Sequence, residues 1–191
     1  MKAVIGLRNP GPEYSLTRHN VGFEVVEAVA DSHGERFRRG PSRTRSETAD
    51  VSIDGQRVVL AAPITFMNES GRSVRSLIDY FDVEPGDLLV VHDDIDLAFG
   101  RLRLQVGGGT GGHNGLRSIE QALGHRDFTR LKVGVGRPPG RMDPAEFVLR
   151  RFTKAERSEV DVLVPEAADV VEAWVADVET ATRMAGERRV P

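Results

Sequence analysis

The sequence predicts an α/β fold: a single domain with a mixed, twisted β-sheet and helices on both faces of the sheet. Strand-like and helix-like segments alternate along most of the chain, which is typical of this class. Asp54-Gly55 joins two strand-like segments and is a strong signal for an antiparallel hairpin, so the sheet is expected to be mixed. The chain of 191 residues shows no repeat or linker, and one domain over residues 1–191 is expected.

The first part of the chain predicts a strand, a helix, a hairpin and a second helix. Residues 2–7 form an apolar run with β-branched side chains, and the hairpin strands cover residues 46–53 and 56–62. Residues 21–31 and 69–81 carry apolar side chains at helical spacing.

The second part continues the alternation. Residues 87–93 have a nearly continuous apolar centre, which indicates a strand that is covered on both faces. Residues 100–106 and 130–135 predict two further strands, and residues 114–123 predict a short helix that ends at Gly124.

Caps and breaks refine this scheme. Asn20 is placed to cap the first helix. Thr153 and Glu156 have the spacing of a capping box before a helical C-terminal region. Within that region, Pro165 is expected either to interrupt the helix or to begin a second one.

The composition argues against several classes of protein. There is no Cys, so disulfides, thiolate nucleophiles and Cys-ligated metals are excluded. The motifs Gly-x-Ser-x-Gly and His-Glu-x-x-His are absent, which argues against an acyl-serine enzyme and a zinc hydrolase of that type. The N-terminal apolar run is far too short for a signal peptide or a membrane span, so a cytoplasmic protein without a membrane partner is expected.

Charge is unevenly distributed although the net charge is only −3. Arginines cluster in residues 34–45, at Arg101 and Arg103, and in residues 137–151, whereas residues 155–180 contain eight acids and one Arg. The loop from residue 39 to 45 is also expected to be mobile. A basic face beside an acidic helical region fits a polyanionic partner bound on one side, and an ordinary solvated surface is the alternative interpretation.

Polar side chains gather on turns next to the predicted elements. His19 lies just before the first helix, where the helix dipole disfavours its charged form, as a general base near neutral pH requires. Asp93, Asp94 and Asp96 follow the buried strand, and one of them is expected to face His19 and orient its ring. Together with nearby Asn side chains, this set is typical of a metal-free hydrolytic site. The alternatives are a divalent metal on the three acids and a loop histidine without a function.

A Gly-rich loop over residues 107–112 matches the spacing G-x-G-x-x-G. The match follows a late strand, and residues 128–130 stand where a ribose-binding acid is expected, so a dinucleotide site is disfavoured. Because the loop leads into a helix at Asn114, its exposed backbone N–H groups are expected to seat a phosphate or a ribose. A flexible turn is the alternative.

Ordered motifs extend along the whole chain. They occupy residues 6–11, 14–20, 66–71, 92–97, 107–116 and 134–138. Together they resemble bacterial peptidyl-tRNA hydrolases, and residues 136–144 are similar to the actinobacterial branch of that family. The resemblance implies the single-domain fold of that family, usually monomeric, with a mobile lid over the cleft.

The resemblance also implies a metal-free and cofactor-free esterase. Such an enzyme cleaves the ester between a peptide, or an N-blocked aminoacyl group, and the 3′-terminal ribose of tRNA. The resemblance assigns His19 as the general base on water and Asp93 as the residue that holds His19. It assigns Asn9 as the residue that positions substrate and distinguishes a blocked from a free amino group. The acceptor stem and 3′-CCA end of peptidyl-tRNA are the expected partner, with contacts from Tyr14, Phe66, Met67, Asn68, Arg103, Gly111, His113, Asn114, Lys132 and Arg141.

Two positions depart from the family pattern. Arg8 stands where the family usually has a small residue, and this cation beside Asn9 is expected either to contact tRNA or to alter entry to the cleft. Lys132 stands where Arg is frequent in the family. Lys keeps the positive charge but lacks the planar guanidinium group that can bind a phosphate through two hydrogen bonds. Two other functions stay open: a non-catalytic RNA-binding relative, and a nucleotide-binding enzyme that uses the Gly-rich loop.

Overall fold

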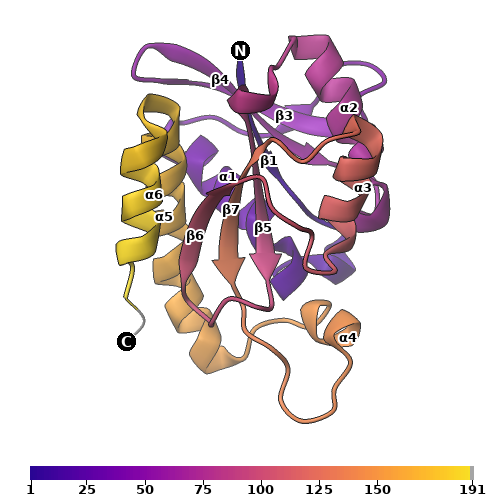
Figure 1. The fold of residues 1–191 in the computed structure, drawn as a ribbon, viewed down its shortest axis with the longest axis vertical. Helices are drawn as coiled ribbons and strands as arrows, with labels where there is room; N and C mark the ends of the chain where they lie inside the picture. The colour runs from indigo at the N-terminus through magenta and orange to yellow at the C-terminus, as the bar shows by residue number, and fades with distance from the viewer. Residues whose placement is uncertain (190–191) are drawn as a thin grey trace.

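The strands build one central sheet, as Figure 1 shows for the computed structural model. The structure describes residues 1–189, and the last two positions of the predicted domain 1–191 lie outside the described residues. Within residues 1–189 the sheet has seven strands in the order β2-β3-β4-β1-β5-β7-β6. Their bounds are β1 Lys2–Gly6, β2 Arg38–Arg39, β3 Ser46–Ile53, β4 Gln56–Pro63, β5 Leu88–Asp94, β6 Leu102–Val106 and β7 Thr129–Gly134.

The sheet contains both parallel and antiparallel pairs. β1 is parallel to β4 and to β5, and β5 is parallel to β7. The pairs β2–β3, β3–β4 and β6–β7 are antiparallel. Asp54 and Gly55 turn the chain between β3 and β4 with φ angles of 50° and 75°, the positive values that a tight hairpin turn needs. The predicted mixed sheet and its hairpin are confirmed.

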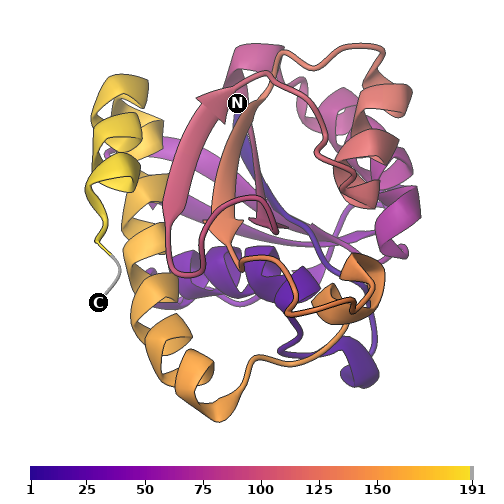
Figure 2. The ribbon, with the colours of Figure 1, turned by 60° about the horizontal axis from the view of Figure 1, so that its bottom comes forward.

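Helices cover both faces of the sheet (Figures 1 and 2). The helices are α1 Val21–Ser32, α2 Ser70–Phe81, α3 Asn114–Leu123, α4 Pro144–Val148, α5 Lys154–Ala176 and α6 Val178–Glu187. α1, α5 and α6 share one apolar core with Val4 and Leu89, and α2 and α3 share the other with Ile5 and Val90. These strand neighbours enter opposite cores because successive side chains of a strand alternate between its faces. No helix in this described range has the length and apolar character needed to cross a bilayer.

Two short elements were not predicted from the sequence. β2 has two residues, and α4 has five. Neither is long enough to show a hydrophobic period. α4 lies beyond the carboxyl ends of β5 and β7 (Figure 1), where it comes close to the candidate site.

Pro165 neither breaks α5 nor begins a new helix. α5 has 23 residues and includes Pro165 in its interior, and the break comes at Asp177, whose carboxylate caps α6. Pro165 is exposed, whereas Val164 and Ala167 beside it are buried against the sheet. A proline inside a helix costs about 3 kcal/mol, and burial of the apolar side chains around it offsets that cost. Both predictions for Pro165 were wrong for this reason.

The loop over residues 39–45, for which the sequence predicts mobility, makes buried contacts with α2. Thr44 is 2% exposed, and its hydroxyl donates to the carbonyl oxygen of Pro41 at 2.7 Å. The buried hydroxyl of Ser73 on α2 donates to the carbonyl oxygen of Thr44 at 2.8 Å. These contacts hold the loop against α2.

Candidate active site

His19 and Asp93 meet because α1 packs very closely on β5. His19 lies on a 3₁₀ turn directly before α1. A Cβ atom on Gly22 would lie 2.2 Å from the carbonyl oxygen of Val91, so only glycine permits this contact. Since Val91 precedes Asp93 by two residues, the contact brings the turn that carries His19 to the end of β5.

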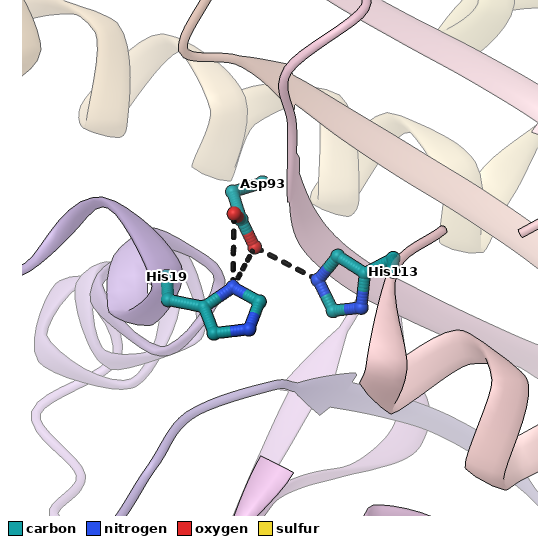
Figure 3. A group of neighbouring side chains, drawn as sticks. All are labelled: His19, Asp93 and His113. Carbon is teal, nitrogen blue, oxygen red and sulfur yellow. Dashed lines mark hydrogen bonds and ion pairs between the residues drawn. The ribbon is translucent and has the colours of Figure 1, made fainter. Parts of the chain in front are cut away.

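Asp93 binds two histidines at once (Figure 3). Nδ1 of His19 lies 2.9 Å from each carboxylate oxygen of Asp93. Nε2 of His113 lies 2.8 Å from Oδ1 of Asp93. Asp93 is 1% exposed, so the carboxylate depends on these rings for its hydrogen bonds.

Hydrogen bonds to the other ring nitrogen fix the proton positions on His113. Nδ1 of His113 accepts from the backbone N–H of Gly115 at 3.1 Å and of Leu116 at 3.3 Å. Nδ1 therefore carries no proton, and Nε2–H donates to Asp93. In His19, Nδ1–H donates to Asp93, and Nε2 points away from it (Figure 3). Nε2 of neutral His19 is thus the available base.

The pKa values of this group follow from burial and close charge. Burial alone raises the pKa of Asp93, but the charges and hydrogen bonds of His19 and His113 outweigh it and hold that pKa well below its usual range. For His19, burial lowers the pKa, while the charge and the hydrogen bond of Asp93 together raise it above the ordinary value of 6.5. The helix-dipole argument predicted the opposite direction for His19. That prediction was wrong because the negative charge of Asp93, in direct contact with His19, outweighs the effect of the helix dipole.

A third histidine stays neutral beside them. His92 lies on β5, and its Nδ1 donates to the backbone oxygen of Asp93 at 2.7 Å. Burial lowers the pKa of His92 to about 3, with a further contribution from His113. His92 therefore adds no positive charge near neutral pH.

His19, Asp93 and His113 also place their ligand atoms within 4.8 Å of one another, as a metal site does. The hydrogen bonding of His113 opposes such a site. A metal on Nε2 would have to displace its proton while Nδ1 still accepts from two backbone N–H groups, which leaves an imidazolate or a broken helix cap. The donor set therefore suits a hydrogen-bonded relay better than metal coordination.

A cavity of about 450 Å³ opens beside these side chains. Its lining includes His19, Asp93, Gly111, His113 and Asn114. Further wall residues come from α4 and its preceding loop, including Asp143 and Val148. A larger and more open depression of about 800 Å³ at Arg101 and residues 186–189 shares no lining residue with this cavity.

Asn9 is held by hydrogen bonds on its backbone and its side-chain oxygen. Its Oδ1 accepts from the backbone N–H of Met67 at 2.7 Å. The side chain of Asn20 pairs with the backbone N–H and C=O of Asn9 at 2.8 and 2.9 Å. Asn20 is the N-cap residue of α1, as predicted, but its side chain makes no capping bond to the helix. Within residues 1–189, the amide NH₂ group of Asn9 makes no hydrogen bond to another residue.

Met67 connects the Asn9 side to the cavity. A Cβ atom on Gly115 would lie 2.7 Å from Sδ of Met67 and 3.0 Å from Cε1 of His113, so this glycine lets both side chains pack together. Asn68 and Asn114 are exposed at the first turns of neighbouring elements. Of these two, only Asn114 lines the cavity itself.

Aromatic side chains extend this surface. Tyr14 and Phe66 meet edge to face with ring centroids 6.4 Å apart. Phe66 is 53% exposed, so part of its ring faces solvent although it contacts Tyr14. The two rings are free to contact a bound molecule.

Asp93 and Asp94 at the end of β5, and Asp96 after it, do not form one metal site. Asp93 faces the two histidines, whereas Oδ2 of Asp94 lies 3.9 Å from Nζ of Lys132. Asp96 forms an ion pair with Arg137. The Gly-rich loop was expected to bind a phosphate or a ribose through exposed backbone N–H groups next to α3. The side chain of His113 already accepts hydrogen bonds from two N–H groups at the start of α3, those of Gly115 and Leu116.

Arg8 does not line the cavity and makes its contacts with the hairpin and α1. Its guanidinium forms an ion pair with Glu47 and donates to the carbonyl oxygen of Pro63 at 3.2 Å. It also stacks on Phe23, 4.2 Å from the ring centroid. Arg8 therefore ties the β3–β4 hairpin to α1.

The predicted RNA-contacting cations lie outside the cavity. Arg103 and Lys132 are direct neighbours across β6 and β7, and they point to the same face of the sheet. Arg103 is exposed, while Lys132 is partly covered. Arg141 is exposed on the loop after β7.

Sequence reasoning missed the role of Arg18. Its side chain is 5% exposed and pairs with Glu156 at 2.7 Å. It also donates to the carbonyl oxygens of Phe147 and Arg151 at 3.3 and 3.1 Å. Arg18 thus joins the His19 turn to the segment between α4 and α5. No local signal predicts this, because its partners are more than 100 positions away in the sequence.

Comparison with known proteins identifies relatives of the whole chain. The family model described as "Peptidyl-tRNA hydrolase" matches residues 3–190. A peptidyl-tRNA hydrolase of Mycobacterium avium (strain 104) is 52% identical over 169 residues, 88% of each chain. One of Frankia casuarinae is 52% identical over 174 residues, which is 91% of this chain and 87% of the relative.

Solved structures show the same likeness. A crystal structure of peptidyl-tRNA hydrolase from Acinetobacter baumannii matches with a TM-score of 0.92 and 35% identity, covering 99% of this chain and 96% of that one. A peptidyl-tRNA hydrolase crystallised with n-propanol gives a TM-score of 0.93 and 34% identity, covering 100% and 97%. The chain therefore belongs to the peptidyl-tRNA hydrolase family of enzymes.

Proposed function

We propose that this hydrolase cleaves the ester between a peptide, or an N-blocked aminoacyl group, and the 3′-terminal ribose of tRNA. This reaction recycles tRNA from peptidyl-tRNA that leaves the ribosome prematurely. The observation that carries the proposal is the base at the cavity: His19 donates Nδ1–H to buried Asp93 and keeps Nε2 free. A non-catalytic RNA-binding protein has no need for this arrangement.

In the proposed reaction, His19 acts on a water molecule. Nε2 takes a proton from water as the water oxygen attacks the ester carbonyl carbon. Asp93 stabilises the imidazolium ion that forms. The bond to the ribose 3′ oxygen then breaks, and the proton passes from Nε2 to that oxygen. The products are a free 3′ hydroxyl on the tRNA and a carboxylic acid on the peptide, which releases its proton to solvent and becomes a carboxylate.

Neutral amides hold the substrate in this proposal. The NH₂ group of Asn9 donates to the acyl part of the substrate and helps to distinguish a blocked from a free amino group. Asn68 and Asn114 hold the substrate and the attacking water, and they supply donors for the oxyanion. Met67 and His113 line the acyl pocket.

The tRNA contacts form the outer part of the site. Tyr14 and Phe66 contact the terminal nucleotides, for which Phe66 offers an exposed ring. Arg103, Lys132 and Arg141 bind phosphates of the acceptor stem. We further propose that the enzyme acts as a monomer without a metal or another cofactor.

The test of this function is selectivity for a blocked amino group. N-acetyl-aminoacyl-tRNA and the corresponding unblocked aminoacyl-tRNA are incubated with the protein, and release of each acyl group is followed. We expect rapid release from the blocked ester only. Equal release from both, or from neither by well-folded protein, would contradict the proposal.

The pH dependence of catalysis follows from the raised pKa of His19. Only neutral His19 can accept the proton, so kcat/KM is expected to rise with pH and to level off above this pKa. Because Asp93 raises the pKa of His19, the half-maximal point is expected above 6.5. Steady-state rates on N-acetyl-aminoacyl-tRNA between about pH 5 and 9 measure it. A midpoint below 6.5 would show that another group controls the rate.

Charge reversal at Arg103 tests the phosphate path. Arg103→Glu is expected to weaken tRNA binding several-fold and to reduce the slope of log Kd against log salt by about 1. Arg183→Glu on α6 is the matched control, since this side chain is 65% exposed and does not line the cavity. Binding titrations at several salt concentrations measure both. An unchanged slope removes Arg103 from the phosphate path.

A further inference from the structure

The arginines of residues 36–45, here called the basic loop, have no carboxylate partners. Each of the five is exposed, and none lies within 4.0 Å of a carboxylate oxygen in the part of the chain that the structure describes. They are Arg36, Arg38, Arg39, Arg43 and Arg45. By contrast, neighbouring Arg8 and Arg57 are paired with Glu47 and Asp50. The basic loop is therefore a concentration of uncompensated positive charge.

Two of these arginines sit on strained backbone. Arg43 and Arg45 have φ angles of 72° and 48°, in the left-handed region that favours glycine. Non-glycine residues persist there only where the surrounding structure enforces the conformation, and such strain gathers at functional sites. Glycine at either position would relieve the strain, yet the chain has a long cation at both.

Buried hydroxyl groups enforce this conformation. Thr44, between the two arginines, is 2% exposed, and its hydroxyl lies 2.9 Å from that of Ser46. The hydroxyl of fully buried Ser73 donates to the carbonyl oxygens of Thr44 and Arg45 at 2.8 and 3.2 Å. The loop therefore presents its two cations from a fixed backbone, which lowers the entropy cost of binding.

The basic loop adjoins the exposed apolar end of the cleft. The carbonyl oxygen of Arg45 accepts from the backbone N–H of Ile64 at 2.9 Å. Ile64 and Phe66 are 46% and 53% exposed, and Met67 contacts Asn9 through its N–H. Residues 64–67 therefore connect the basic loop to Asn9 through these two hydrogen bonds. Since β2 and β6 are opposite edges of the sheet, the basic loop lies toward the opposite edge from Arg103.

We propose that Arg43 and Arg45 form a second phosphate-binding surface for the RNA whose 3′ end enters the cleft. The ligand is the sugar–phosphate backbone, for which planar guanidinium groups are suited. The RNA then contacts cations on both sides of the cleft: Arg103 and Lys132 at one edge of the sheet and the basic loop toward the other. This inference rests on the proposed function, which supplies the RNA.

The test compares two double variants on two substrates. Arg43→Gln/Arg45→Gln removes both charges and keeps long non-glycine side chains at the strained positions. Arg126→Gln/Arg183→Gln removes the same charge from side chains that are 61% and 65% exposed and that line neither the cavity nor the basic loop. The substrates are full-length N-acetyl-aminoacyl-tRNA and the same acyl ester on a short CCA oligonucleotide. Thermal unfolding confirms the fold of each variant.

We expect the loop variant to lose about tenfold in kcat/KM on full-length tRNA, and its salt slope to fall by about 2, because two phosphate contacts are removed. On the CCA ester it should match wild type, and the control variant should match wild type on both substrates. Unchanged kcat/KM on tRNA, or equal losses on both substrates, would overturn the second surface. If wild type cleaves neither ester, the proposed function itself fails, which is a distinct outcome.

Discussion

His19→Ala is expected to lower the single-turnover rate of ester cleavage by at least about 10²–10⁴-fold, the usual contribution of a positioned general base. Binding of tRNA is expected to change little, because His19 is only 8% exposed and offers small contact area. Rates are measured with enzyme in excess over N-acetyl-aminoacyl-tRNA, and binding is measured with deacylated tRNA. The separation of the two effects identifies His19 as a group that acts on the reacting atoms.

His33→Ala is the matched control for this prediction. His33 follows α1 and pairs with Glu172 on the surface, and it does not line the cavity. The control is expected to keep wild-type rates and binding. Equal losses of rate and binding in His19→Ala would mean that the residue serves the structure or the RNA contact rather than proton transfer.

Asp93→Asn is expected to reduce kcat by about 10³–10⁴-fold with little change of shape, because the orienting carboxylate of a histidine base is worth that much in comparable triads. The neutral amide oxygen of Asn lacks the full negative charge with which the carboxylate accepts from both His19 and His113. Its NH₂ group also lacks an acceptor, since both facing ring nitrogens carry protons. The histidines are then expected to lose their fixed tautomers and orientations.

The same variant makes a second, independent prediction about pH. Asp93 raises the pKa of His19, and burial lowers it, so removal of the carboxylate leaves burial alone. The midpoint of the remaining activity is therefore expected to move to lower pH while the rate falls. Asp87→Asn is the control, since Asp87 pairs with Lys2 directly before the other end of β5 and does not line the cavity. An unchanged pH midpoint in Asp93→Asn would show that Asp93 does not raise the pKa of His19.

Much of the fold could be predicted because its elements have strong local patterns. The hairpin follows from Asp54-Gly55, and the double burial of β5 follows from its continuous apolar centre. β2 and α4 were missed because they are too short to show a period. Pro165 was misjudged because packing of the buried face of α5 depends on the sheet, which the local sequence does not reveal.

The candidate site was predictable as a set of residue types but not as a network. The sequence placed His19 and Asp93 near the ends of elements, and the structure puts them 2.9 Å apart. The capping of α3 by His113, the pairing of Asn20 with Asn9, and the engagement of Arg8 by Glu47 all depend on tertiary contacts. Predicting the direction of the pKa shift of His19 also requires knowledge of a tertiary contact, the one with Asp93.

The most direct test of the account is release of N-acetyl-aminoacyl groups from tRNA in excess EDTA, by wild type and by His19→Ala. We predict cleavage by wild type that resists the chelator and is lost in a folded variant that still binds tRNA. This result would support the substrate, the metal-free reaction and the base together. Cleavage that persists in His19→Ala, or that EDTA abolishes in wild type, would contradict the account.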